Sequence, residues 1–345
     1  MQKHSKVLTL FLTMAFLLTP HAGIAKKKLE AVEPSGEITG TTVNVLWQQP
    51  PDLASRNLYY GPGGEAHQPH GNFTFVKEDL KGSNPKFVVR DDDGVEWKIK
   101  LGAEARPETV ATRLVWAVGY HADEDYFMPR VQVKEMPLYV HRGKDLVYPD
   151  GSMYNARLER EDKPGKNLGI WKWRDNPFIG TREYNALRVL LSVMNAWDVK
   201  DINNEVRQIK LPGGERERIY EVSDLGVSFG APGLEHYHEQ SRGNLEYYRR
   251  AKFFLKVTPD LVSFESPRRP AIVAWVNPPH YISRLKLRWI GRNIPRSHAR
   301  WMGELLAQLT PEQLHDAFRA AGYSPQDIEG FTAVLQSRIQ ELTKL

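Results

Sequence analysis

The feature that most restricts the fold is a change of hydrophobic pattern along the chain, from strands to helices. Short segments rich in β-branched and aromatic residues come first, at Phe73–Val76, Lys86–Arg90 and Val95–Leu101. Each has the length and composition of a strand. Asp91–Gly94 is typical of a hairpin turn. Residues 126–160 alternate in the same way and predict further strands.

Helical patterns interrupt these strands and then follow them. Apolar residues recur at helical spacing after Pro107, which suits a first helical turn, and Gly119 ends this predicted helix. A second helix is predicted from Thr181 to about Ala196, with its threonine as the cap. Beyond residue 240 we expect mostly helix, with Thr310 and Ser324 opening the last two helices. This order predicts an α+β fold of two lobes with a cleft between them.

The first 25 residues have the layout of a signal peptide. Lys3 and Lys6 precede an apolar run over Val7–Thr19, and Gly23–Ala25 supplies small residues at a cleavage point. We therefore expect export, to the periplasm or outside the cell. Because Lys26–Lys28 would resist translocation, an uncleaved membrane anchor is the alternative, and we expect no other contact with a membrane.

The rest of the chain divides into three predicted parts. Residues 26–55 contain several prolines and glycines with little periodicity, which indicates a linker or loosely packed leader. Residues 56–160 would form the strand-rich lobe. Residues 161–345 would form the helical lobe.

Composition limits the chemistry. The chain has 345 residues and no cysteine, which excludes disulfides, thiolate nucleophiles and cysteine-based zinc sites. Its net charge is +5, a mild excess that suits an acidic ligand such as a nucleotide phosphate. The scattered basic pairs are typical of a solvated surface, so we expect no nucleic-acid partner.

Two acidic motifs indicate the chemistry most directly. The segment Asp198–Asn203 follows the predicted helix over residues 181–196, and Asp224–Gly226 follows a strand-like segment, Arg218–Val222. Phosphoryl transfer needs a carboxylate near the attacking oxygen and oxygen ligands that hold Mg²⁺ against the phosphates. The spacing of these motifs would supply both.

Each motif residue has an expected role. Asp198 would orient or deprotonate the acceptor, and Lys200 would neutralise charge on the transferred group. Asn203 and Asp224 would bind the metal, while Gly226 would let the backbone turn. The alternatives are structural: a capped helix end or Asx-turn for the first motif, and a turn aspartate for the second.

These motifs resemble a known family. D-x-K-x-x-N followed by D-x-G is similar to the catalytic and metal-binding loops of protein kinases. The turn Gly82–Phe87, which includes Ser83 and Lys86, resembles the phosphate loop of HipA-type atypical kinases. The resemblance implies that this turn covers the phosphates of ATP. It also implies that Lys100, or alternatively Lys98, contacts them, with Glu108 as its ion-pair partner.

The same resemblance, over roughly residues 72–230, implies a two-lobed protein-kinase-like fold, ATP and Mg²⁺ as cofactors, and a protein or small molecule as acceptor. The usual His-Arg before the catalytic aspartate is Ala196-Trp197 here, and neither a G-x-G-x-x-G loop nor an A-P-E segment is present. These departures point to an atypical kinase, a group that includes HipA-like, phosphoinositide and secretory-pathway members. An inactive pseudokinase and an unrelated envelope protein stay open. The acceptor, the transferred group and the oligomeric state also stay open.

One further motif suggests a metal. His236 and His238 have the spacing of two zinc ligands on a strand, but no third ligand is identifiable, so a solvated loop is favoured.

Overall fold

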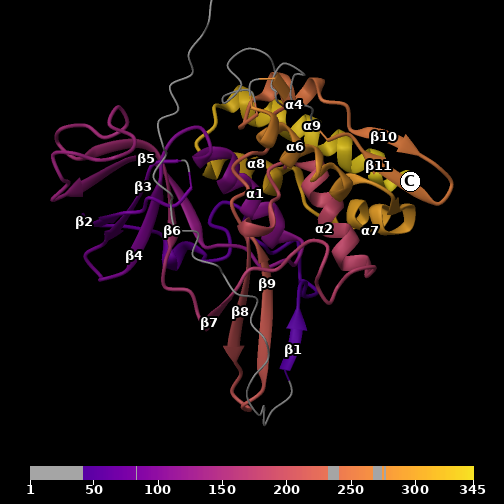
Figure 1. Cartoon of the computed structure of the whole chain (residues 1–345), viewed down its shortest axis with the longest axis horizontal. Coiled ribbons are helices and arrows are strands. Elements are labelled where there is room, and N and C mark those ends of the chain that lie inside the picture. Colours follow the sequence, from indigo (N-terminus) through magenta and orange to yellow (C-terminus); the bar gives the residue numbers. More distant parts are fainter. Residues whose placement is uncertain (1–41, 83, 232–240, 267–273, 276) are drawn as a thin grey trace, which may run out of the picture. The chain divides into compact units, whose positions relative to one another are not determined.

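The computed structural model describes residues 42–82, 84–231, 241–266, 274–275 and 277–345. They belong to one compact unit. Its strands and helices, labelled in Figure 1, confirm the predicted α+β class. The expected signal peptide, Ser83 and the His236/His238 motif lie outside the described residues. Among the helices of the described part, none has the length and apolar character needed to cross a membrane.

The predicted strands of the front half close into a barrel. Its order is β2-β3-β4-β6-β5, and β2 pairs with β5 in parallel. Phe87, Ile99 and Leu158 fill its interior and are fully buried. The Asp91 carboxylate accepts bonds from the backbone of the predicted turn and from the Trp97 indole, which fixes the hairpin. The strands are β2 Phe73–Glu78, β3 Lys86–Arg90, β4 Glu96–Lys100, β5 Asp125–Lys134 and β6 Ser152–Arg160.

The predicted helix after Pro107 is confirmed as α1, Ala105–Ala117, between β4 and β5. Gly119 follows it with φ of +96°, and a Cβ there would lie 2.2 Å from the Gln48 carbonyl oxygen. Glycine is therefore required at this helix end.

A second sheet contains the strand that precedes Asp224. Its order is β1-β9-β8-β7, and Figure 1 shows β1, β9 and β8 side by side. The linker expected over residues 26–55 is wrong for its last part, because β1 pairs in parallel with β9 and Leu46 and Leu53 are buried. The strands are β1 Thr42–Val45, β7 Lys166–Gly169, β8 Asn204–Lys210 and β9 Arg216–Val222.

The second half supplies most of the helices. The threonine cap of α2 is confirmed, and Thr310 forms a full capping box with Gln313. The rear was expected to be mostly helical, and besides its helices it contains a three-stranded sheet, β10-β11-β12, that was not predicted. The elements are α2 Arg182–Val193, η2 Asp201–Asn203, α4 Leu245–Arg250, β10 Phe254–Val257, β11 Leu261–Phe264, α6 Pro278–Leu285, η3 Arg288–Gly291, β12 Ile294–Pro295, α7 Arg296–Leu306, α8 Pro311–Ala320 and α9 Pro325–Thr343; a short helix in the first half, η1 Glu65–His67, completes the set.

Buried apolar side chains form two separate clusters. One fills the barrel, and the other joins α1 and α2 to the C-terminal helices. Because α1 packs on the second cluster while its first turn faces β4, it links the barrel to the helices.

Candidate active site

Lys100, the last residue of β4, is the centre of the candidate site. Its side chain is 2% exposed, and its Nζ lies 2.7 Å from Glu108, 2.6 Å from Asp224 and 2.8 Å from Glu104. Three elements thus direct carboxylates at one ammonium: the first turn of α1, the residue before it, and the segment after β9. The predicted pair of Lys100 and Glu108 is therefore formed.

Lys98, the alternative to Lys100, lies in a different environment. It precedes Lys100 by two residues on β4, and its Nζ contacts Glu161 and lies 3.9 Å from Glu159. Its side chain is more exposed than that of Lys100. It therefore does not take part in the acidic cluster around Asp224.

Burial and ion pairing oppose each other at this cluster. Burial lowers the pKa of Lys100, but the carboxylates of Glu108, Asp224 and Glu104 outweigh it and hold that pKa well above its usual value. Burial raises the pKa of Glu108 to about 7, although Arg157, 3.4 Å away, and Lys100 favour its charged form. The lysine therefore stays charged, while Glu108 is close to its titration point at neutral pH.

Asp224 occupies a constrained backbone position directly after β9. Its φ is +55°, in the left-handed region that few residues other than glycine, asparagine and aspartate adopt. Its side chain is 45% exposed, in contrast to its buried neighbours. Burial of the carboxyl raises its pKa, but Lys100 outweighs this, so the pKa of Asp224 lies below its usual value. The carboxylate is thus ionised and within reach of a ligand.

Gly226 in the same motif is explained by packing. A Cβ at this position would lie 2.5 Å from the Glu104 Cβ, closer than two carbon atoms can approach. The third residue of D-x-G must therefore be glycine because the chain passes over Glu104.

Hydrogen bonds connect the segment Asp198–Asn203 to the Asp224 motif. The Asn203 side-chain Nδ2 donates to the Asp198 carbonyl oxygen at 3.0 Å. The backbone N–H and the hydroxyl of Ser223 donate to the Asn203 carbonyl oxygen at 3.0 and 2.7 Å. Lys200 Nζ lies 3.0 Å from the Asp198 carboxylate. The two predicted motifs therefore meet.

The turn between β2 and β3 borders the same cluster. Gly82 has φ of +71°, which suits a tight turn, and Asn84 donates to the Glu104 carboxylate at 2.5 Å. Lys86 is paired with Lys100 across β3 and β4, and its charge helps to lower the pKa of Asp224. The predicted residues Gly82 and Lys86 thus belong to a turn that contacts the site.

Glu104 is a residue of the site that the sequence reasoning missed. It precedes α1 and contacts Lys100, Asn84 and Arg242, the last through Arg242 Nε at 2.8 Å. Its place four residues before Glu108, at the cap of the predicted helix, was the available indication, since that spacing puts the two residues on one helix face. The contact with Arg242 joins segments 138 residues apart and leaves no local pattern.

No protein-family model matches the chain, and no curated protein matches it. Among solved structures, the proinflammatory kinase CtkA of Helicobacter pylori matches with 10% identity over 80% of this chain and 98% of its own, with a TM-score of 0.44.

Two other kinase structures match less closely. The Rio2 kinase of Chaetomium thermophilum, in complex with ADP/Mg²⁺-phosphoaspartate, matches with 11% identity, 79% and 72% coverage, and a TM-score of 0.30. Amicoumacin kinase hAmiN, in complex with AMP-PNP and Ca²⁺, matches with 11% identity, 79% and 89% coverage, and a TM-score of 0.18.

The three carboxylates around Lys100 are close enough together to bind a metal ion. Oxygens of Glu104, Glu108 and Asp224 lie within 4.8 Å of one another. The Lys100 ammonium contacts all three, so a cation already occupies the centre of this group. Asp224 and Asn203 are the better Mg²⁺ ligands, because a half-exposed carboxylate and an amide oxygen are the hard donors that this ion prefers.

Proposed function

We propose that this protein is a kinase-like phosphotransferase that binds ATP with Mg²⁺. The observation that supports it most is the buried Lys100, which is held by Glu108 of α1 and contacts Asp224, a half-exposed carboxylate at a strained turn. A structural ion pair would not need the strained, accessible aspartate. A phosphate-binding lysine beside a metal-binding carboxylate needs both.

Each side chain then has a defined task. Lys100 would bind nucleotide phosphates through its ammonium, oriented by Glu108 and Glu104. The turn from Gly82 to Lys86 would cover the phosphates and add the charge of Lys86. The hydrogen bond from Asn84 to Glu104 would hold this turn in position over the phosphates.

The metal would be held by Asn203 and Asp224. The bond from the Asn203 amide nitrogen to the Asp198 carbonyl fixes the amide orientation, which makes the amide oxygen the metal-binding atom. When bound, Mg²⁺ would neutralise negative charge on the phosphates. Asp198 would accept a hydrogen bond from the acceptor, and Lys200 would counter the charge of the group in transfer.

The finer fold assignment is also part of the proposal. Two separate apolar clusters, one in the barrel and one among the helices, support a two-lobed arrangement. The order of β2, β3, β4 and α1, followed by the two motifs, supports an atypical kinase of HipA type.

Mg²⁺-dependent nucleotide binding tests this function. Calorimetry with a non-hydrolysable ATP analogue should detect binding that requires Mg²⁺ in the wild type and is lost in Asp224→Ala. Asp162→Ala, which removes a carboxylate that is 81% exposed and distant in sequence, is the matched control and should bind like the wild type. Equal binding by wild type and Asp224→Ala, or none by either, would reject the site.

A nucleotide-binding pseudokinase or envelope scaffold is the second candidate. Asp224 and Asp198 are both ion-paired to lysines, at 2.6 and 3.0 Å, and these bonds would have to open before a metal or an acceptor could bind. Transfer of label from ATP by wild type, and not by Asp198→Ala, would favour the enzyme. Binding without transfer would favour the scaffold.

We also propose export, on the N-terminal pattern alone. Lys3, Lys6 and the apolar run over Val7–Thr19 support a signal peptide or an uncleaved anchor. Fractionation of cells that produce the full chain, with mass measurement of the exported form, would separate the two. Retention of intact chain in the cytoplasm would reject both.

A further inference from the structure

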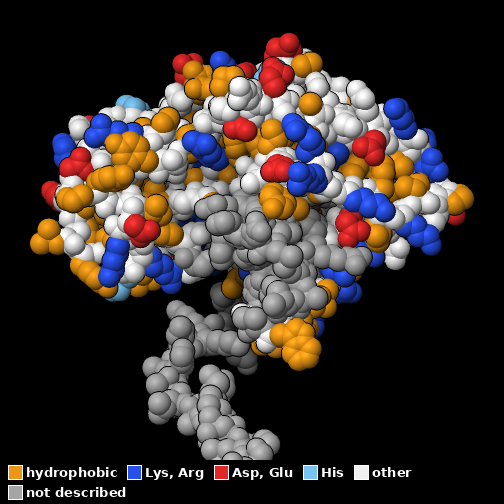
Figure 2. Space-filling model, turned by 90° about the horizontal axis from the view of Figure 1, so that it is seen from above, with side chains coloured by type: hydrophobic (Ala, Val, Ile, Leu, Met, Phe, Trp, Pro, Cys, Tyr) orange, Lys and Arg blue, Asp and Glu red, His pale blue; other side chains and the backbone are white. Residues whose placement is uncertain are grey.

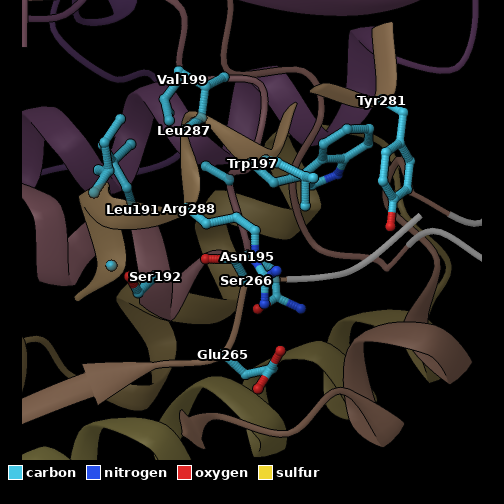
Figure 3. A pocket seen from close by; sticks show the side chains of 14 residues that line it. Leu191, Ser192, Asn195, Trp197, Val199, Glu265, Ser266, Tyr281, Leu287 and Arg288 are labelled. Carbon is cyan, nitrogen blue, oxygen red and sulfur yellow. The ribbon is translucent and has the colours of Figure 1, made fainter. Parts of the chain in front are cut away.

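A pocket of about 130 Å³ lies beside the Asp198 segment and is separate from the acidic cluster around Lys100. Figure 3 shows side chains from the end of α2, from the Asp198 segment, and from the region around α6 and η3 directed toward it. Its walls combine apolar side chains with polar groups from Ser192, Asn195, Glu265, Ser266 and Arg288. The main apolar residues are Leu191, Trp197, Val199, Leu285, Leu287 and Ile290.

Arg288 is the distinctive polar residue of this pocket. Among the described residues it has no hydrogen bond or ion pair, and its Nε is buried with no hydrogen-bond partner. A guanidinium stays charged at any physiological pH. Since an unpaired cation in a partly enclosed site is costly, an anion in the pocket would be stabilised.

Glu265 is not the missing partner of Arg288. Its carboxylate lines the same pocket, and Figure 3 shows both side chains directed into it. No ion pair joins the two within the described part of the chain, and Glu265 interacts elsewhere. Among the described residues, the Arg288 guanidinium is therefore left without an ion pair beside the apolar part of the pocket.

We propose that this pocket binds a small monoanion with a compact apolar body, such as an aromatic carboxylate. The anionic group would pair with Arg288, and the apolar body would contact Trp197 and Leu191. The volume of about 130 Å³ is slightly below the roughly 150 Å³ of an apolar cavity that accommodates benzene, so the apolar body can be no larger than a single ring. This binding site is additional to the nucleotide site.

Because of where the pocket lies, a bound anion would affect the Asp198 segment. Trp197 and Val199 line the pocket and flank Asp198 on either side. A ligand packed against them would restrict the Asp198 segment and so change the rate of transfer to the acceptor. This consequence rests on the proposed function, whereas binding itself does not.

The test uses benzoate as probe and benzamide as its neutral counterpart of the same shape. Saturation-transfer NMR and titration on the full chain should detect benzoate with at least tenfold higher affinity than benzamide, the difference expected for one charge-assisted hydrogen bond. Arg288→Gln should remove this preference. Lys256→Gln, which removes a charge from the exposed face of β10, should retain it.

Three results would count against the proposed anion site. Equal binding of benzoate and benzamide, unchanged binding in Arg288→Gln with native circular dichroism, or no binding of benzoate to wild type would overturn the proposal. A second titration follows the phosphotransfer rate as benzoate is added. If no transfer is found but benzoate binds through Arg288, the anion site stands and the proposed function fails.

Discussion

Replacement of Lys100 by methionine is the sharpest test of the acidic cluster. Methionine is of similar length and apolar, so the change removes the charge and little volume. It leaves Glu108 and Glu104, with side chains 2% and 6% exposed, without the ammonium that contacts both. Removal of one partner of a buried ion pair costs about 3–5 kcal/mol, because the remaining charge is uncompensated.

Two arginines beside the glutamates should keep the cost of removing Lys100 near the lower end of this range. Arg157 lies 3.4 Å from Glu108, and Arg242 lies 2.8 Å from Glu104. We therefore expect Lys100→Met to lower the free energy of unfolding by about 3 kcal/mol at pH 8.

The penalty should also depend on pH. The pKa of Glu108 is already raised to about 7 in the folded wild type, and loss of Lys100 would raise it further. A carboxyl with a raised folded pKa binds a proton more readily in the folded than in the unfolded protein, so its destabilising effect grows as pH rises through that range. The difference between wild type and variant should therefore be largest above pH 7 and should shrink toward pH 5.

Urea denaturation at pH 5 and pH 8 measures these differences. Lys98→Met is the matched control on the same strand, and its more exposed pairs should contribute about 1 kcal/mol or less. The double variant Lys100→Met, Glu108→Gln should recover part of the loss, because the buried charge is then removed as well. Equal penalties for Lys98→Met and Lys100→Met, or a double variant no more stable than the single one, would refute the proposed role of the buried charge.

Three further predictions concern stability and are checked by the same denaturation assay. Gly226→Ala should cost about 1–3 kcal/mol, because its Cβ would meet Glu104, whereas Gly213→Ala, which meets nothing within 4 Å, should be nearly neutral. Burial lowers the pKa of His121 to about 4, so the unfolded chain binds more protons than the folded one between about pH 4 and 6.5, and stability should rise with pH there. His121→Gln should flatten this rise, and an unchanged profile would contradict the assignment. Thr310→Ala removes the capping box of α8 and should cost about 1 kcal/mol, while no measurable loss would show that the cap is replaceable.

The parts of this fold that were predictable are those fixed by local chemistry. The cap of α2, the turn at Asp91 and the end of α1 at Gly119 depend on residues within a few positions of one another. The pairing of Lys100 with Glu108 was expected from the family resemblance, and the two residues, at the end of β4 and in the first turn of α1, are only eight positions apart.

Long-range pairing explains what was missed. Nothing in Thr42–Val45 indicates that it pairs in parallel with Arg216–Val222, more than 170 residues away, because the partner strand supplies the bonds. The short strands β10, β11 and β12 lack the length and alternation that distinguish a strand from a loop.

The charges of the cluster indicate which residue can exchange partners. Three carboxylates, on Glu104, Glu108 and Asp224, contact Lys100, and Arg242 and Arg157 add positive charge beside Glu104 and Glu108, although Arg157 also pairs with Asp125 and Glu159. Glu104 and Glu108 are almost fully buried, so separation of either from Lys100 would leave a desolvated charge. Asp224 is 45% exposed, and water can solvate its carboxylate when the bond to Lys100 opens. Asp224 is therefore the member that can release the lysine to a phosphate and accept a metal ion in its place, while the two glutamates hold the lysine in position.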